Sequence, residues 1–285
     1  MAVPVTAALD GAVDTAVGKA AQARGGLARY TLASAMAGVY VGVAVVLLVS
    51  VSGPLVAAGS PWAKLVQGAV FGIALTLVVF AGAELFTGNV MWMAQGLMAR
   101  KVPVRQAVSV CLLSLVGNLV GSVALAAMVF AGGTLGVGTP GQKLIGTMVT
   151  AKIHETGAQL FFRAVLCNML VCLALWMAGR ASSDGAKLAV LWWGLLAFIG
   201  SGFEHSVANM TIFSLAIFNH QAHWSDLARN LLYTVPGNVV GGAVLVGLVY
   251  SWLGRARRAA GSMPGVAALS GSGGTTRSEH EAVTV

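Results

Sequence analysis

The sequence predicts an all-α polytopic membrane protein with six transmembrane helices, arranged as two inverted three-helix repeats in which the second and fifth helices are broken. Three observations lead to this fold class: the composition, the spacing of apolar stretches and an internal repeat. The 285 residues are 57% hydrophobic and 9% charged, with a mean hydropathy of +0.83. These values exclude an ordinary water-soluble domain with a polar shell.

Six apolar stretches are long enough to cross a bilayer, which takes roughly 20 residues of mainly apolar helix. They lie near 32–53, 65–98, 106–131, 158–179, 188–219 and 229–253. The second and the fifth are too long for one straight crossing, and each contains a polar interruption. We therefore expect these two helices to be broken within the membrane.

The two ends of the chain differ in composition from the six-helix transmembrane domain at 31–254. Residues 1–30 are Ala-rich and predict a cytoplasmic amphipathic helix, whereas the Gly/Ser-rich residues 255–285 predict a disordered cytoplasmic tail. Basic residues favour one side of the membrane, so the positive-inside rule places both termini of this multi-pass protein in the cytoplasm. The net charge of +8 is scattered among loops, which argues against a nucleic-acid partner.

An internal repeat relates the two halves of the chain. The segment "AGAELFTGNV" at 81–90 aligns with "SGFEHSVANM" at 201–210, which pairs Glu84 with Glu204 and Asn89 with Asn209 at an offset of 120. The same offset places "VGNLVG" at 116–121 on "PGNVVG" at 236–241. Each half then holds three spans, an odd number, so the halves insert with opposite orientation. Inverted repeats of this kind place their site near the bilayer midplane.

The interruptions themselves are "ELFTGN" at 84–89 and "EHSVAN" at 204–209. A half-helix that begins after Thr87, Asn89 or Ser206 would have a suitable capping side chain and free backbone N–H groups at its start. Such a helix terminus favours a nearby anion.

An ionisable side chain at bilayer depth costs at least roughly 2.5 kcal/mol on insertion scales, so each one needs a partner or a task. Glu84 and Glu204 occupy equivalent positions in the two halves, which favours a structural role at the helix breaks, shared with Asn89 and Asn209. We expect each carboxylate to accept hydrogen bonds from the N–H groups that the break sets free.

His205 breaks the symmetry of the repeat, since its counterpart is Leu85. A lone histidine is often a satisfied core residue, but one beside a helix break of an inverted repeat lies where a permeating solute would pass. An imidazole can donate a hydrogen bond to an anion or change its charge near neutral pH. Thr87, in the other interruption, could orient that ring through its hydroxyl or serve only as an N-cap.

Other signals do not develop into a metal, cofactor or catalytic site. The segment "HETGA" at 154–158 begins like a zinc-protease motif, but Ala158 stands where the second histidine is required. His220 and His223 lie in a short loop with only Asp226 nearby. The three cysteines, in apolar segments, lack metal-ligand spacing. We expect no cofactor and no metal.

The motifs "AGAELFTGN", "VGNLVGS", "LCNMLVCLALWM", "SGFEHSVANM" and "PGNVVGG" occur in an order that closely resembles the formate/nitrite transporter family. The similarity runs from roughly residue 30 to 254. The resemblance implies an aquaporin-like fold of six spans, assembled as a homo-pentamer with one pore in each protomer and a lipid-filled central hole.

The resemblance also implies roles for single positions. His205 is similar to the family's central pore histidine and Thr87 to its partner, while Phe71 and Phe198 match the outer apolar constriction. Further pore positions implied in this way are Leu75, Leu85 and Phe86 at the inner constriction, Asn168 and Val171 in the fourth span, and Lys152, a basic residue of the outer vestibule.

The segments "FTGNVMWM", "ALWMAGR" and "ANMTIF" resemble the nitrite branch of the family. Our hypothesis is a channel or transporter for small monovalent anions, nitrite foremost, which cross either hydrogen-bonded to His205 or protonated as nitrous acid. A formate or hydrosulfide channel is the alternative within the family, followed by a channel for water or small neutral solutes. An intramembrane enzyme using Glu204 and His205 as an acid/base pair lacks a nucleophile.

Overall fold

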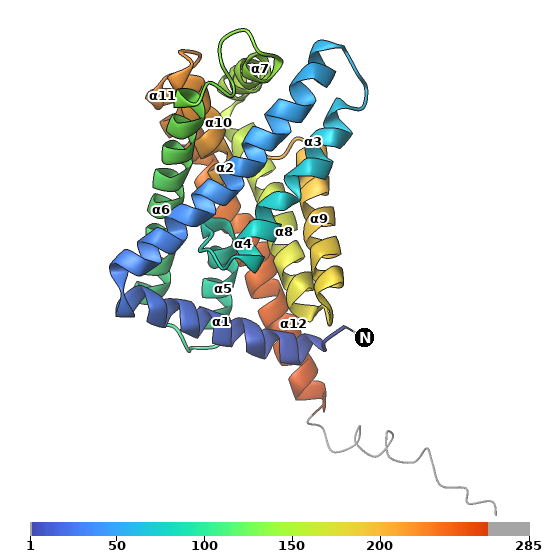
Figure 1. Cartoon of the computed structure of the whole chain (residues 1–285). Coiled ribbons are helices and arrows are strands. Elements are labelled where there is room, and N and C mark those ends of the chain that lie inside the picture. The colour runs from blue at the N-terminus through green and yellow to red at the C-terminus, as the bar shows by residue number, and fades with distance from the viewer. Residues whose placement is uncertain (1, 262–285) are drawn as a thin grey trace, which may run out of the picture.

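The structure, a computed structural model, describes residues 2–261. Over this range the chain is built from helices and their connecting turns, without a strand (Figure 1). In chain order the helices are α1 (Val5–Gly25), α2 (Leu27–Ala57), α3 (Ala63–Phe71), α4 (Ile73–Phe80), α5 (Phe86–Met98), α6 (Val104–Ala131), α7 (Pro140–His154), α8 (Gly157–Arg180), α9 (Asp184–Gly200), α10 (Ser206–Phe218), α11 (Trp224–Val239), η1 (Val240–Leu248) and α12 (Val249–Gly261).

Five helical stretches of the described chain are long and apolar enough to cross a membrane: Leu27–Ala57, Ala63–Phe80, Val104–Ala131, Gly157–Arg180 and Trp224–Ala256. Four predicted spans, at 32–53, 106–131, 158–179 and 229–253, each fall within one of these stretches. The predicted stretch at 65–98 is divided among α3, α4 and α5, and the stretch at 188–219 is divided between α9 and α10, which have 17 and 13 residues.

The outer surface of the bundle carries rows of apolar side chains, unlike the polar surface of a water-soluble protein. Helix α6 exposes about half of each apolar side chain in a row at four-residue spacing, namely Val108, Leu112, Val116 and Val120. Its one asparagine, Asn118, is instead fully buried. A helix that turns apolar side chains outward and polar ones inward fits a hydrocarbon environment.

Glycines allow two helix pairs to approach closely. A Cβ at Gly121 of α6 would lie 1.8 Å from the carbonyl oxygen of Ala35 in α2. At the matching position of the repeat, a Cβ at Gly241 would lie 2.2 Å from the carbonyl oxygen of Val165 in α8. These glycines therefore pack inside the chain, where each brings two helix backbones into contact.

Helix α1 lies across one end of the bundle, at the bottom of Figure 1. It buries one face, made of Val5, Leu9, Ala12, Ala16 and Ala20, whose spacing of three and four residues is that of a helix stripe. Helix α12 continues to Gly261, past the predicted domain boundary at 254. The remainder of the predicted tail, 262–285, lies outside the described residues.

Two further irregularities were not predicted from the sequence. The helix at 63–80 is interrupted at Gly72, where a Cβ would come within 2.3 Å of Trp192, and Trp192 Nε1 donates to the Ala69 carbonyl at 2.7 Å. The last long helix contains Pro236 and then a wide π-helical segment, η1. Such segments occur often at functional sites.

Candidate functional site

The chain leaves helical geometry twice in the middle of an apolar region, at 81–85 between α4 and α5 and at 201–205 between α9 and α10. Both interruptions begin with a glycine in the left-handed region, Gly82 with φ of 76° and Gly202 with φ of 72°. Residues with a Cβ rarely adopt this conformation, so glycine is needed at both positions. These two glycines are the ones that the repeat pairs.

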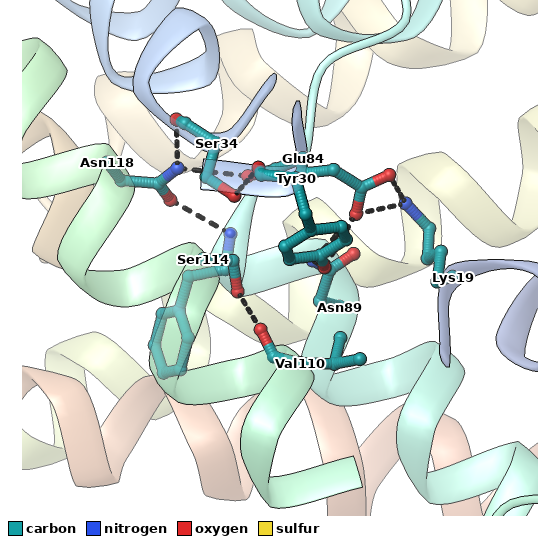
Figure 2. Close-up of polar contacts among 9 residues, drawn as sticks. Lys19, Tyr30, Ser34, Glu84, Asn89, Val110, Ser114 and Asn118 are labelled. Atoms are coloured by element: carbon teal, nitrogen blue, oxygen red, sulfur yellow. Dashed lines mark hydrogen bonds and ion pairs between the residues drawn. The ribbon is translucent and has the colours of Figure 1, made fainter. Parts of the chain in front are cut away.

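Asn118 of α6 holds the first interruption in place (Figure 2). Its Oδ1 accepts from the Phe86 N–H at 2.9 Å, and its Nδ2 donates to the carbonyls of Ser34 at 2.7 Å and Glu84 at 2.9 Å. The side chain is fully buried, where water cannot reach, so Asn118 supplies the hydrogen bonds that water would otherwise make to these backbone groups.

Asn238 of α11 makes the equivalent set of contacts at the second interruption. Its Oδ1 accepts from the Ser206 N–H at 2.9 Å, and its Nδ2 donates to the carbonyls of Ala164 at 2.8 Å and Glu204 at 3.1 Å. The repeat aligned Asn118 with Asn238, but the sequence did not indicate that these amides bind the breaks.

The Glu84 carboxylate lies at the α1 end of the bundle and contacts side chains only (Figure 2). Lys19 of α1 reaches both of its oxygens at 2.7 Å. The Tyr30 hydroxyl and Asn89 Nδ2 each donate to Oε2 at 3.0 Å. Burial of this charge is thus offset by a cation and two neutral donors.

Glu204 is held in the corresponding way at the α7 end. Lys152 of α7 forms an ion pair with its Oε1, and Asn209 Nδ2 donates to its Oε2 at 2.7 Å. The expectation that the two carboxylates accept the N–H groups freed by the breaks is wrong, because Asn118 and Asn238 accept from the first N–H of each new helix. A backbone amide is satisfied by an amide oxygen, which leaves the carboxylates to the lysines.

The N-caps also differ from those that the sequence suggested. Helix α5 begins at Phe86 after Leu85, which caps nothing with its side chain, and α10 begins at Ser206 after His205. His205 Nδ1 accepts from the Ala208 N–H at 3.1 Å, so the imidazole itself is the N-cap. Thr87, Asn89 and Ser206, the expected caps, lie inside the helices.

These contacts determine where the His205 ring carries its proton. A nitrogen that accepts from an amide N–H is unprotonated, so the single proton of the neutral ring is on Nε2. Nε2 lies 3.1 Å from Thr87 Oγ1, and both side chains are buried. The structure therefore brings the predicted pair together, with the N–H of the ring directed at the hydroxyl.

Aromatic rings surround the imidazole on its other side. The Phe198 ring stacks on it at 5.7 Å between centroids and 19° between planes. The Phe71 ring meets Phe198 edge-on, also at 5.7 Å, with 83° between planes. The two phenylalanines predicted to form a constriction are thus in contact with each other, and one of them contacts His205.

Three cavities follow one another through the bundle, from the α7 end to the α1 end. The α7-side cavity and the middle cavity share Phe198 and His205 in their walls. The middle cavity and the α1-side cavity share Leu85. The middle cavity is apolar apart from the imidazole, and it is lined by Val41, Phe71, Ala74, Leu75, Leu85, Val171, Leu195, Phe198 and His205.

Most predicted pore positions line these cavities, and three do not. Thr87, Phe86 and Asn168 are absent from all three walls. Asn168 Nδ2 donates to the Thr87 carbonyl at 3.0 Å and to the Asn238 carbonyl at 2.6 Å. In this structure Asn168 therefore ties α8 to the start of α5 and to α11.

Lys152, expected by resemblance in an outer vestibule, lines the α7-side cavity and is paired with Glu204. Arg163, Lys64 and Glu155 share the cavity wall, and Arg163 forms an ion pair with Glu155. Burial and the neighbouring Glu204 carboxylate raise the pKa of Glu155, which ends α7, and this effect exceeds the opposing effect of Arg163 and Lys152.

Sequence reasoning missed Lys19, Tyr30, Arg163 and Glu155. Lys19 and Tyr30 reach Glu84 from outside the repeat, so no offset could reveal them. The sequence offered one signal, and only for Lys19: it is the single lysine of the Ala-rich residues 1–30. Among the described residues no group of three or more His, Cys, Asp or Glu side chains could hold a metal ion.

Comparisons with known proteins show which family the chain resembles. The sequence model of the formate/nitrite transporter family matches residues 6–252. The nitrite transporter NirC of Salmonella typhimurium is 44% identical over 226 residues, which is 78% of this chain and 81% of that protein. The formate channel BtFdhC of Bacillus thuringiensis is 40% identical over 194 residues, which is 66% of this chain and 74% of that one.

Solved structures resemble the fold as a whole. An FNT family ion channel superposes with a TM-score of 0.82 at 39% identity, covering 87% of this chain and 99% of that one. A pentameric formate channel with formate bound superposes with a TM-score of 0.66 at 31% identity, covering 79% and 96%. With its several apolar helices and its match over most of its length, this multi-pass membrane protein belongs to the formate/nitrite transporter family.

Proposed function

We propose that the chain conducts nitrite across the membrane through a pore formed by the three successive cavities. The observation that carries the proposal is the position of His205, whose ring is in the wall of both the α7-side cavity and the middle cavity. It is the one polar side chain in the wall of the middle cavity, which is otherwise apolar. The similarity to nitrite transporter NirC supports nitrite as the anion.

The cavities suggest a route with charged mouths and an apolar centre. The α7-side cavity is the outer vestibule, where Lys152, Lys64 and Arg163 attract an anion. Phe71 and Phe198 form the outer constriction. Leu75 and Leu85 form the inner constriction, with Val171 in the wall between, whereas Phe86, also expected there, lies outside the cavity walls. The α1-side cavity, with Lys19 and Lys187, is the inner vestibule.

His205 acts in this proposal as a hydrogen-bond donor. A bare anion entering the apolar passage would lose its hydration, which is costly without a replacement partner. The Nε2–H group, oriented by Thr87 at rest, supplies that partner. Because Nδ1 already accepts from Ala208, giving up the Nε2 proton would leave a negatively charged ring. A proton that crosses with nitrite therefore joins it in a vestibule and does not come from His205.

The architecture we propose around this pore has six spans in two inverted repeats. Helices α3, α4 and α5 together form a broken second span, and α9 and α10 form a broken fifth. Glu84, Glu204, Asn89 and Asn209 fix these breaks, as their matching contacts suggest. Residues 31–254 form the pore domain, 1–30 an amphipathic cytoplasmic segment and 255–285 a cytoplasmic tail. The similarity to a pentameric formate channel supports a pentamer.

A formate channel is the second candidate, favoured by the 40% identity to formate channel BtFdhC. Hydrosulfide remains the third anion of this class. The enzyme alternative is disfavoured by geometry, because the Glu204 carboxylate binds Lys152 and Asn209 and is not directed at His205. Competitive uptake of nitrite, formate and hydrosulfide into proteoliposomes at two pH values separates the three anions.

The role of His205 is tested by two substitutions with opposite expectations. His205→Phe removes the donor and the cap, and we expect nitrite influx into proteoliposomes to fall about 10- to 100-fold, the effect of one hydrogen bond to a charged group. His205→Asn keeps a cap oxygen and N–H donors but cannot titrate. We expect it to retain influx within about tenfold of the parent protein, with an unchanged pH dependence.

Two results would contradict the proposal. Unchanged nitrite influx and pH dependence in His205→Phe would remove His205 from the pathway. Loss of the pH dependence in His205→Asn alone would make the ring a proton donor. Trp193→Phe, at an exposed position of α9, is the control for effects of aromatic substitution on reconstitution.

A further inference from the structure

A fourth cavity lies at the α1 end of the molecule and is separate from the proposed pore. It has a volume of about 300 Å³ and shares no lining residue with the three pore cavities. Its walls come from α1, from the end of α5 with the turn that follows, and from α12. Figure 1 shows α1 below α5 and crossing α12.

Gln95 of α5 lines this cavity and lacks any hydrogen-bond partner. The side chain is fully buried, and neither its amide nitrogen nor its amide oxygen bonds to another described residue. A buried amide without partners costs about 1–3 kcal/mol, so such a group calls for an explanation. A ligand in the cavity would provide the missing acceptor for the amide N–H₂ group.

Two cationic side chains, Lys101 and Arg255, line the same cavity. The backbone at Lys101 is fixed by a tight turn, in which its N–H donates to the Gly96 carbonyl at 3.0 Å. The turn requires Arg100 in the left-handed region, with φ of 58°, an uncommon conformation for a side chain other than Gly or Asn. The chain thus accepts local strain where it places Lys101 at the cavity.

The polar groups of the cavity favour an anion over a cation. The carbonyls of Gly96 and Leu97 at the end of α5 accept from N–H groups of the turn, and neither residue belongs to the cavity wall. Asp10 of α1 contributes one carboxylate to the wall, against the two cations. The Ser251 hydroxyl, also in the wall, donates to the Gly247 carbonyl and keeps its lone pairs.

We propose that this cavity, here called the Gln95 cavity, binds a small anion of the phosphate class, held by Lys101 and Arg255 and by the Gln95 amide. The shared chemistry is a phosphate group, which comes either from a soluble phosphate compound or from the headgroup of an anionic lipid. The site does not depend on which anion the pore carries. It joins α1 to α5 and α12, so its occupancy stabilises the docking of α1.

Inorganic phosphate and lipid discs of defined composition are the probes. The full chain is placed in discs of phosphatidylcholine or of phosphatidylcholine with phosphatidylglycerol, and its melting temperature is followed during a millimolar phosphate titration at constant ionic strength. For a soluble ligand we expect a saturable rise in both kinds of disc. For a lipid ligand we expect the phosphatidylglycerol discs alone to raise the melting temperature and to suppress the response to phosphate.

Variants assign the response to the cavity. Lys101→Gln and Arg255→Gln should each raise the half-saturating phosphate concentration about tenfold or more. Gln95→Leu should abolish the response while leaving the ligand-free melting temperature equal or higher, because the unpaired amide is gone. Arg100→Asn, a neighbouring loss of charge outside the cavity wall, is the matched control and should respond like the parent protein.

The proposal is overturned by an absence of any saturable response in both kinds of disc. It is overturned equally by a response that all three cavity variants retain. A change of melting temperature in Gln95→Leu with an intact phosphate response would show that Gln95 has only a packing role. Nitrite influx without phosphate, measured in parallel, reports on the pore alone, so failure here is distinct from failure of the proposed function.

Discussion

The break before α5 and the break before α10 are built from the same parts. Each has a glycine in the left-handed region and a glutamate paired with a lysine. In each, an asparagine on a neighbouring helix also forms three hydrogen bonds to backbone groups. They differ at the residue that precedes the new helix, which is Leu85 in the first break and His205 in the second. The scaffold is therefore duplicated, whereas the imidazole is present in the second break only.

This comparison separates stability from function. Parts found in both breaks should affect folding equally in the two halves when they are changed. Parts found in one break only should affect transport while leaving the fold intact. Four predictions follow, and the first three change matched positions in the two halves of the chain.

The close glycine contacts should show the largest effect on folding. Gly121→Ala and Gly241→Ala each place a Cβ about 2 Å from a backbone carbonyl, at 1.8 Å and 2.2 Å. Because backbone cannot move aside as a side chain can, we expect a loss of more than about 3 kcal/mol and little folded protein. Size-exclusion chromatography and thermal melting measure both variants. Gly11→Ala, with open space around its Cβ, should be neutral or slightly stabilising.

The asparagines that bind the breaks should come next. Asn118→Leu and Asn238→Leu each remove three buried hydrogen bonds to the backbone, including the one to the first N–H of the new helix, and we expect each to lower the free energy of unfolding by about 4 kcal/mol. Asn219→Leu, which loses one hydrogen bond at a helix end, should lose about 1 kcal/mol. A large difference between the first two variants would contradict the equivalence of the breaks.

The lysines should show a smaller effect on stability and a directional effect on transport. Lys19→Met and Lys152→Met each leave a buried carboxylate without its counter-charge. We expect each to lower the free energy of unfolding by about 3 kcal/mol, the lower end for a broken buried pair, because the lysine side chains are 15% and 11% exposed and so keep some contact with solvent. The double variants with Glu84→Gln or Glu204→Gln should recover most of that loss. In salt titrations of nitrite influx, Lys152→Met should weaken the salt dependence for entry from the α7 end only.

Glu155→Gln should show the smallest effect. The pKa of Glu155 is raised in the folded protein, so its ionised form is disfavoured by folding, and this small destabilisation disappears as the pH falls through the folded pKa. The substitution should therefore change stability by less than about 1 kcal/mol at neutral pH. Acidification should also free Arg163 and make the α7-side cavity more positive. We expect a lower KM for nitrite at mildly acidic pH, by about threefold, and no such change in Glu155→Gln.

Much of the fold could be predicted because hydropathy and the repeat act on long segments. The offset of 120 paired Gly82 with Gly202 and Asn118 with Asn238, and the structure gives each pair the same conformation or the same contacts. The interruption at Gly72 could not be predicted. It depends on a tertiary contact with Trp192, which no local pattern of apolar residues encodes.

The contacts within the site were harder to predict than its members. His205 and Thr87 were paired correctly, but the prediction that the carboxylates accept the N–H groups of the breaks was wrong. Sequence alone cannot choose between a side-chain amide and a carboxylate, because both oxygens accept hydrogen bonds. What decides between them is distance across the bundle: Asn118 and Asn238 face the breaks, whereas the glutamates point toward α1 and α7. Single-sequence patterns carry no information on such directions.

Both lysines that neutralise the break carboxylates come from helices outside the five stretches of the described chain that are long and apolar enough to cross a membrane, Lys19 from α1 and Lys152 from α7. In each half the lysine also precedes its glutamate in the chain. Because synthesis starts at the N-terminus, each lysine is therefore synthesised before the glutamate that it neutralises. Each acidic segment enters the lipid after its counter-charge has been made, so neither break has to be inserted ahead of its partner.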